Sequence, residues 1–415
     1  MMDRRQFARL AAALAAGLVA FPSLAADPVR IAFIDPLSGP FAAVGTSGMR
    51  QAQFTADEIN KAGGVLGGRK LEVIGFDNKI SPKESLIQLK RVIGEGIQVI
   101  MQGNSSGVAN ALIDAVAKHN EREPGKRVLY LNYSAVDPSL TNEKCSYWHF
   151  RFDANADMKM NALTDVIATN KNMKKIYIIG QDYSFGKAVA AAAVRDLSLK
   201  RPDIEIVGNE LHPIGKVKDF SPYIAKIKAS GAQAVITGNW GADMLNLSKA
   251  ASDAGLEIPF YTYYAAGNGI TKAIGAGGVG KVRLVHEGPS NPPLTDAWRN
   301  LEKRYEAKYN DKENFTQPRI SNTVHMLANA INKAKSTDPA KVAAALEGMR
   351  YTTIWGDVVT MRASDHQLQM PIRISVHTNK GIEFDMDHSG YGLLTESEVS
   401  AHVASTPTTC KMKRP

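Results

Sequence analysis

Cysteine is scarce in this sequence. The 415 residues include two cysteines, Cys145 and Cys410, and their spacing matches no metal-binding motif. In an exported chain, two distant cysteines form one disulfide more often than they form a site. We therefore expect a Cys145–Cys410 disulfide, with two separate thiols as the alternative.

Long apolar runs are missing after the first 25 residues, so we expect no direct membrane insertion of the mature chain. The N-terminus is different. Three arginines precede the apolar run Leu10–Phe21, and Ser23–Ala25 has the small residues of a cleavage site. This order is typical of an export signal peptide, here residues 1–25. The stretch Asp3–Phe7 resembles a twin-arginine signal, and an ordinary secretory signal remains open.

A strong excess of positive charge is also lacking. The formal charge of +9 falls to +7 without the signal, and no cluster of Lys and Arg is interleaved with aromatic residues. The sequence therefore predicts no nucleic-acid partner.

Metal and nucleotide motifs are absent or incomplete. There is no His-Glu-x-x-His and no Cys-x-x-Cys, and Asp365-His366 is interpreted as a solvated turn. Gly275–Gly280 fits the dinucleotide fingerprint, but a predicted strand, Lys281–His286, follows it where a helix is required. We interpret Gly275–Gly280 as a turn and expect no metal and no cofactor.

What the chain does contain is a strand–helix alternation that occurs twice. Such alternation predicts parallel sheets covered by helices, and hence an α/β fold of two lobes that face each other. Ligands of such sheets bind beyond the carboxyl ends of the strands. The expected strands are Val29–Ile34, Arg69–Phe76, Ile97–Met101 and Arg127–Asn132 in the first lobe, and Lys175–Gly180, Ile204–Glu210, Ala234–Thr237 and Phe260–Tyr263 in the second.

One loop at a strand end permits two interpretations. Gly103–Gly107 fits the nucleophile elbow of serine hydrolases, with Ser105 as nucleophile. Alternatively, Ser105 and Ser106 are helix-cap hydroxyls beside a ligand site, which the two-lobe pattern favours. A hydrolase would need one of the histidines that follow in the chain, which include His149, His212, His286 and His366.

Aromatic residues gather just after the predicted strands, where a cleft is expected. They suit a ligand with an apolar or planar body. The residues are Tyr133, Tyr183, Phe185, Trp240, Tyr263 and Tyr264.

The sequence resembles the periplasmic solute-binding proteins of the branched-chain amino acid (LIV-binding) family, the receptors of ABC importers. The resemblance spans almost the whole mature chain. It is carried by IAFIDPLSGPFAAVGTSG, NKAGGVLGGRKLEVIGFDN, SAVDPSLTN, IIGQDYSFGKAVA and the tail TTCKMKRP. It implies a type I periplasmic binding protein fold without catalysis, in which two Rossmann-like lobes of parallel sheet close on a ligand. Three crossover strands would lie near Phe150-Arg151, His286-Glu287 and Gln369-Met370.

The resemblance also implies site residues. Ser105 and Ser106 match the hydroxyls that hold a ligand carboxylate, and the next loop matches Ser134-Ala135-Val136. The aromatic residues of the second lobe match Phe185, with Tyr183 nearby, and Trp240. The acid that pairs with an amino-acid ammonium falls at Asn268.

Three positions depart from this pattern. Val136 replaces a threonine, Asn268 replaces the acid, and Val44 stands where relatives often carry an aromatic residue. A desolvated ammonium without an anionic partner costs several kcal/mol. The sequence therefore favours an aromatic or apolar carboxylate over a branched-chain amino acid, although an amino-acid ligand of the same family type remains the alternative.

We thus expect an exported periplasmic binding protein, a monomer, which delivers a small-molecule ligand to the membrane permease of an ABC transporter. A sensor that reports to a membrane receptor is the other option. The expected division is lobe 1 at 27–150 plus 287–369, and lobe 2 at 151–286 plus 370–415.

Overall fold

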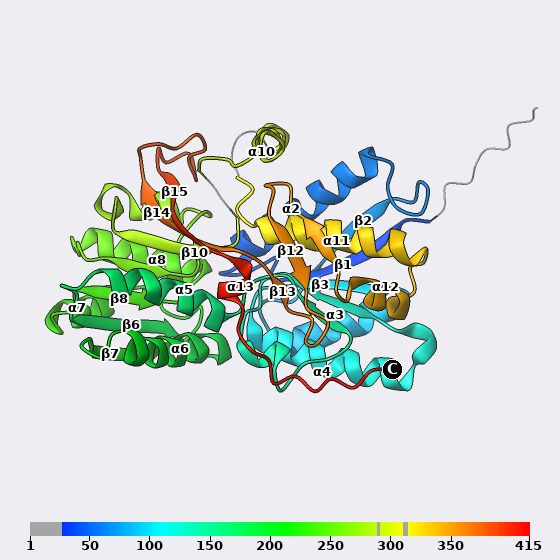
Figure 1. Ribbon diagram of the computed structural model, residues 1–415, viewed down its shortest axis with the longest axis horizontal. Helices are drawn as coiled ribbons and strands as arrows, with labels where there is room; N and C mark the ends of the chain where they lie inside the picture. The colour runs from blue at the N-terminus through cyan, green and yellow to red at the C-terminus, as the bar shows by residue number, and fades with distance from the viewer. Residues whose placement is uncertain (1–26, 289–290, 310–313) are drawn as a thin grey trace, which may run out of the picture.

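The computed structural model describes residues 27–288, 291–309 and 314–415. The signal expected at residues 1–25 lies outside them. Two lobes stand side by side, each built on its own sheet, as Figure 1 shows. None of the described helices is long and apolar enough to cross a bilayer.

Lobe 1 is built on a five-stranded parallel sheet in the order β2-β1-β3-β4-β5. Its strands are β1 (Val29–Asp35), β2 (Leu71–Asp77), β3 (Val99–Gln102), β4 (Leu129–Asn132) and β5 (His149–Arg151). Helices cover both faces of this sheet, as is usual for parallel sheets. The helices are α2 (Ala42–Lys61), α3 (Pro82–Gly94), α4 (Ser106–Arg122), α11 (Pro318–Ala334) and α12 (Pro339–Leu346).

Lobe 2 has a seven-stranded sheet in the order β15-β14-β10-β9-β8-β6-β7. The strands are β6 (Lys175–Gln181), β7 (Glu205–His212), β8 (Ala234–Thr237), β9 (Phe260–Thr262), β10 (Val282–His286), β14 (Ile372–Thr378) and β15 (Gly392–Val399). β14 pairs antiparallel with both β10 and β15 at one edge, and the other pairs are parallel. The helices are α5 (Ala156–Thr169), α6 (Ser184–Lys200), α7 (Ser221–Ala229), α8 (Gly241–Asp253), α9 (Ile270–Ile274) and α13 (Ala401–Ala404).

Short elements complete the fold. A small antiparallel sheet holds β11 (Arg350–Thr352), β12 (Val358–Met361) and β13 (Leu368–Gln369), and helix α10 spans Asp296–Lys308. The 3-10 turns are η1 (Pro124–Lys126), η2 (Pro138–Thr141) and η3 (Ala276–Gly278). The Gly275–Gly280 stretch is thus a turn before β10, as predicted.

Three crossovers join the lobes, after β5, after β10 and between β13 and β14, where the sequence predicted them. They lie against one another. Arg151 Nε donates to Gln367 Oε1 at 2.6 Å, and Arg373 Nη1 donates to the carbonyl of Glu287 at 3.2 Å. Hydrogen bonds between the crossovers therefore connect the three segments that join the lobes.

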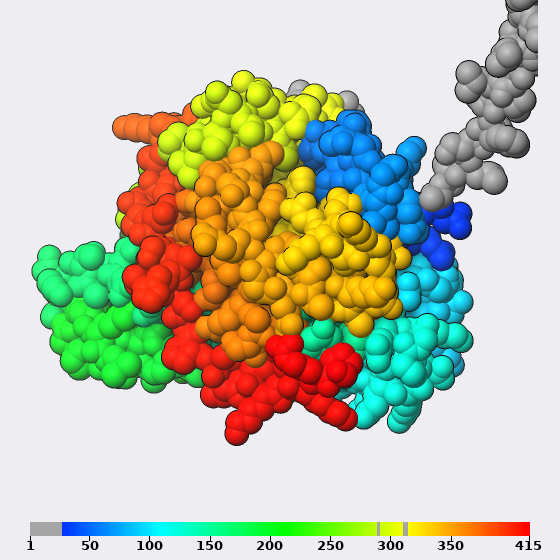
Figure 2. Space-filling model, turned by 45° about the vertical axis from the view of Figure 1, so that its right-hand side comes forward, coloured from blue at the N-terminus to red at the C-terminus, as the bar shows by residue number. Residues whose placement is uncertain are grey.

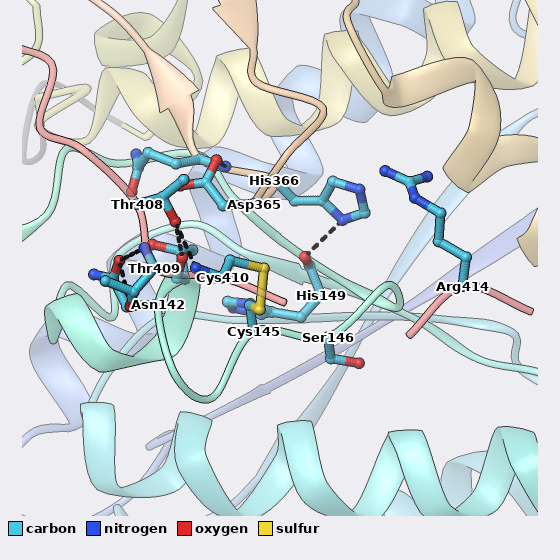
Figure 3. Close-up of a disulfide and its surroundings, with 12 residues drawn as sticks. Asn142, Cys145, Ser146, His149, Asp365, His366, Thr408, Thr409, Cys410 and Arg414 are labelled. Atoms are coloured by element: carbon cyan, nitrogen blue, oxygen red, sulfur yellow. Dashed lines mark hydrogen bonds between the residues drawn. A yellow bond between two sulfur atoms is a disulfide. The ribbon is translucent and has the colours of Figure 1, made fainter. Parts of the chain in front are cut away.

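The C-terminal tail forms a further link. After β15 of lobe 2, the chain runs back across the surface to lobe 1, in red in Figure 2. Cys410 is bonded to Cys145, which confirms the predicted disulfide, with Cα atoms 5.7 Å apart. Beside it, Thr409 N donates to Asn142 Oδ1 at 2.9 Å (Figure 3).

The turn at Asp365-His366 is buried, so the prediction of a solvated turn is wrong. The His366 ring stacks on Phe150, with ring centres 3.8 Å apart, and its Nε2 lies 2.7 Å from Glu347 Oε1. Asp365 pairs with Arg362, which also donates to the tail at Thr406. The C-terminal tail covers this turn. The residues around the turn do not indicate this contact, so the sequence did not predict the burial.

Candidate functional site

A cavity lies between the lobes, beyond the carboxyl ends of β3, β4, β6, β8 and β9. This is where ligands of open α/β sheets bind. All the residues predicted to bind a ligand line this cavity, and their contact with a ligand remains a prediction. They are Val44, Ser105, Ser106, Ser134, Ala135, Val136, Tyr183, Phe185, Trp240 and Asn268.

The lobe 1 wall is polar and includes the start of α4. Ser105 is the N-cap residue of this helix, and its Oγ accepts from Val108 N at 3.4 Å. Ser105 has a φ of 81°, in the left-handed region that non-glycine residues rarely adopt. Ser106 Oγ accepts from Asp137 N at 3.2 Å and so ties α4 to the loop after β4. Helix N-termini favour anions.

Asp35, at the end of β1, holds the loop before α4 in place through hydrogen bonds. Its buried carboxylate accepts from Gly103 N at 3.3 Å, from Asn104 N at 2.9 Å and from the Tyr133 hydroxyl at 2.7 Å. Burial raises the pKa of Asp35 to about 7, against the lowering effect of these hydrogen bonds. A Cβ on Gly103 would lie 2.7 Å from the Tyr133 ring, so this position admits no side chain without movement. Tyr133, expected at the cleft, instead supports the wall.

The lobe 2 wall is aromatic. Tyr183, Phe185 and Trp240 line it, and the Trp240 indole N–H donates to the Tyr183 hydroxyl at 2.8 Å. Tyr263 and Tyr264 continue the surface, as predicted from their position after β9. Rings of this kind suit the planar or apolar body of a ligand.

The two lobes touch each other beside the cavity. Phe41 of lobe 1 packs on Trp240 of lobe 2, with ring centres 4.4 Å apart. It fits between Gly215 and Gly241, where an added Cβ would lie 2.8 Å and 2.6 Å from the Phe41 ring. Because Phe41 is buried in this slot, the structure represents a closed arrangement of the lobes.

A cluster of buried charges also lines the cavity, and sequence reasoning missed it. Lys159 Nζ lies 2.8 Å from Asp153 Oδ1, and Arg319 Nη1 lies 3.0 Å from Glu287 Oε1. Arg319 Nε is 3.6 Å from Asp153 Oδ2, which joins the two pairs. Lys159, Glu287 and Arg319 line the cavity. Glu287, Arg319 and the Asp153–Lys159 pair come from three separate segments, so no spacing in the sequence could have indicated the cluster.

The Glu287 carboxylate stays ionised at neutral pH. Burial raises its pKa, but the cations Arg319 and Lys159 outweigh burial and bring the pKa down to about 2. The carboxylates correspondingly raise the pKa of Arg319 despite its burial. The cluster therefore places the Arg319–Glu287 pair beside the Lys159–Asp153 pair.

The serine hydrolase interpretation finds no geometric support. Ser105 Oγ caps α4, and each histidine considered for a triad is hydrogen-bonded to another residue within the described chain. The hydrogen-bond partners are Asn132 for His149, Asn239 for His212, Ser375 for His286 and Glu347 for His366. Within residues 27–288, 291–309 and 314–415, no group of three or more His, Cys, Asp and Glu side chains could hold a metal ion.

Comparison with known proteins decides the family. The model of the periplasmic binding protein family matches residues 28–381. The chain belongs to this family. The chain is 32% identical, over the full length of both proteins, to "Leu/Ile/Val-binding protein homolog 4" of Brucella abortus.

Solved structures of other periplasmic binding proteins share the fold. A leucine-, isoleucine-, valine-, threonine-, and alanine-binding protein from Brucella ovis, in its closed conformation, superposes with a TM-score of 0.80 at 31% identity, covering 94% of this chain and 100% of the other. A solute-binding protein of an ABC transporter from Rhodopseudomonas palustris, in complex with 3,4-dihydroxybenzoic acid, gives a TM-score of 0.77 at 18% identity, covering 90% and 98%.

Proposed function

We propose that this periplasmic binding protein captures a small organic carboxylate with an aromatic or apolar body and delivers it to the permease of an ABC importer. One observation carries the proposal: a single cavity joins the polar start of α4 to the aromatic wall of lobe 2. The first feature suits a carboxylate and the second suits its body.

The residues around the cavity argue against a zwitterionic head group. Asn268 lines the cavity where the family resemblance implies an acid, and Val136 offers no hydroxyl. An ammonium group beside Asn268 would be desolvated without an anionic partner, which costs several kcal/mol.

The Glu287 carboxylate supports a second candidate, an amino acid. Its Oε2 atom is buried and has no hydrogen-bond partner within the described chain. It could therefore receive an ammonium group in place of the missing acid. The names of the relatives, which include Leu/Ile/Val-binding protein homologues, point the same way.

Isothermal titration calorimetry with benzoate and with leucine tests the choice. We expect heat of binding with benzoate and none with leucine, because Ser105 and Ser106 hold the carboxylate and Asn268 offers no charge to an ammonium. Tight leucine binding would overturn the proposal in favour of the second candidate.

Ligand capture would proceed by a population shift. Contacts to both lobes favour the closed arrangement, in which Phe41 sits in its slot. We propose 27–150 plus 287–369 and 151–286 plus 370–415 as the two moving bodies, with one amendment. The tail is bonded to lobe 1 through Cys145, so its last residues move with lobe 1. We further propose that the protein acts as a monomer after export to the periplasm.

A further inference from the structure

The charged cluster leaves several buried polar atoms unsatisfied at one place. Glu287 Oε2, Gln317 Nε2 and Arg319 Nε have no hydrogen-bond partner within the part of the chain that the structure describes. Arg319 Nε lies 3.6 Å from Asp153 Oδ2, too far for a hydrogen bond. All three side chains are more than nine-tenths buried, and all three residues line the cavity.

These atoms belong to one contiguous group centred on Arg319. Its Nη1 donates to Glu287 Oε1 at 3.0 Å, and its Nη2 donates to Gln317 Oε1 at 3.1 Å. The guanidinium also lies 5.8 Å from the centre of the Tyr264 ring, whose hydroxyl is likewise buried without a partner in the described residues. Buried polar groups nearly always find partners, so a cluster of such atoms beside a cavity calls for a ligand.

We infer that this cluster is a second polar subsite, and that it takes a hydroxyl group carried by the body of the ligand. The inference rests on the proposed carboxylate function and adds a chemical requirement to it. A hydroxyl both donates and accepts, so it can donate to Glu287 Oε2 and accept from Gln317 Nε2 or Arg319 Nε.

An ammonium group fits the subsite less well. It has only donors, so it could use Glu287 Oε2 but would leave the Gln317 and Arg319 donors unpaired. An ether or a methyl group would leave the acceptor Glu287 Oε2 unsatisfied, and a buried acceptor without a hydrogen bond is costly.

A ligand series tests the inference on the unmodified protein. Calorimetry compares benzoate with 2-, 3- and 4-hydroxybenzoate, and with the methyl ether of each. We expect one hydroxybenzoate to bind roughly 10- to 100-fold more tightly than benzoate and than its own ether, the range for a hydrogen bond to a charged group. If benzoate binds and every hydroxybenzoate stays within about 2-fold of it, the subsite inference is wrong and the proposed function stands. If no benzoate derivative binds, both fail.

An isosteric variant then assigns the effect to Glu287. Glu287→Gln keeps an oxygen for Arg319 and replaces Oε2 by an NH₂ group, so the preference for hydroxyl over methyl ether should fall to ~3-fold or less. Asp196→Asn is the matched control, because Asp196 is a buried carboxylate that accepts from Arg195 at 2.7 Å on α6. This control should keep the full preference. An unchanged preference in Glu287→Gln would overturn the assignment, and Gln317→Glu offers an independent second variant if Glu287→Gln does not fold.

Discussion

The two walls of the cavity are built by different means. Around the start of α4, the lobe 1 wall consists of short residues, and the loop before them is held by hydrogen bonds from Gly103 N and Asn104 N to a buried carboxylate, Asp35. The lobe 2 wall consists of large rings held by packing and by one indole hydrogen bond between Trp240 and Tyr183. Hydrogen bonds fix direction, whereas ring packing tolerates variation in shape. We therefore expect the lobe 1 wall to select the head group, and the lobe 2 wall to contribute affinity for a range of bodies.

The largest expected effect concerns the support of the lobe 1 wall. The pKa of Asp35 is about 7 in the folded protein and near 3.8 without burial. Between these values the folded state binds the extra proton, so the contribution of Asp35 to stability falls as pH rises from about 4 to 7. Relative to Asp35→Asn, the wild type should lose on the order of 4 kcal/mol of unfolding free energy across this window. Urea denaturation at several pH values measures the difference.

Asp77 provides the matched control for Asp35. It lies opposite Asp35 in the register of β1 and β2, and its carboxylate accepts from Leu37 N at 2.9 Å. Hydrogen bonds from Ser38 and from neighbouring backbone outweigh partial burial and lower the pKa of Asp77. The pH dependence of the Asp77→Asn variant should therefore be opposite to that of Asp35→Asn. Asp77→Asn should lower the unfolding free energy at neutral pH, and this loss should shrink as pH falls through the folded pKa of Asp77. Parallel pH profiles for the wild type and Asp35→Asn would contradict the role given to Asp35.

Much of this fold could be predicted because its strands are short, apolar and separated by turn residues. The order of strands and helices also predicted that Ser105, Tyr183 and Trp240 lie at one cavity, because the carboxyl ends of the strands in a parallel sheet meet at one edge. Tyr133 was misplaced because a ring after a strand has the same sequence pattern whether it faces the cleft or the residues beneath it.

The features that could not be predicted depend on contacts between distant segments. Arg319 lies in the first turn of α11, and Glu287 follows β10. Their pairing depends on how the crossover after β10 brings Glu287 beside the start of α11, which no local pattern encodes. His366 is buried for the same kind of reason, because it contacts Phe150 and Glu347 from distant segments of the chain.

A smaller effect is expected from the lobe 2 wall. Trp240→Ala removes both the ring that lines the cavity and the contact with Phe41. Loss of a buried aromatic anchor costs ~2–4 kcal/mol of binding free energy, or roughly a 30- to 1,000-fold rise in Kd. Calorimetry with benzoate measures this change. Trp240→Phe keeps a ring against Phe41 and should recover most of the affinity. Equal affinity in wild type and Trp240→Ala would show that the aromatic wall does not bind the ligand.

The smallest effect is expected at Ser105, where folding and binding can be separated. Ser105→Ala removes the N-cap hydroxyl of α4 and should cost about 1 kcal/mol of stability. Ser105→Gly also removes the hydroxyl, but glycine adopts the φ of 81° without strain, so its stability should stay near that of the wild type. If the hydroxyl holds the ligand carboxylate, both variants should weaken benzoate binding by about the same factor, near 10-fold. Weakened binding in Ser105→Ala alone would mean that Ser105 only supports the helix, and that the backbone N–H groups of α4 bind the carboxylate by themselves.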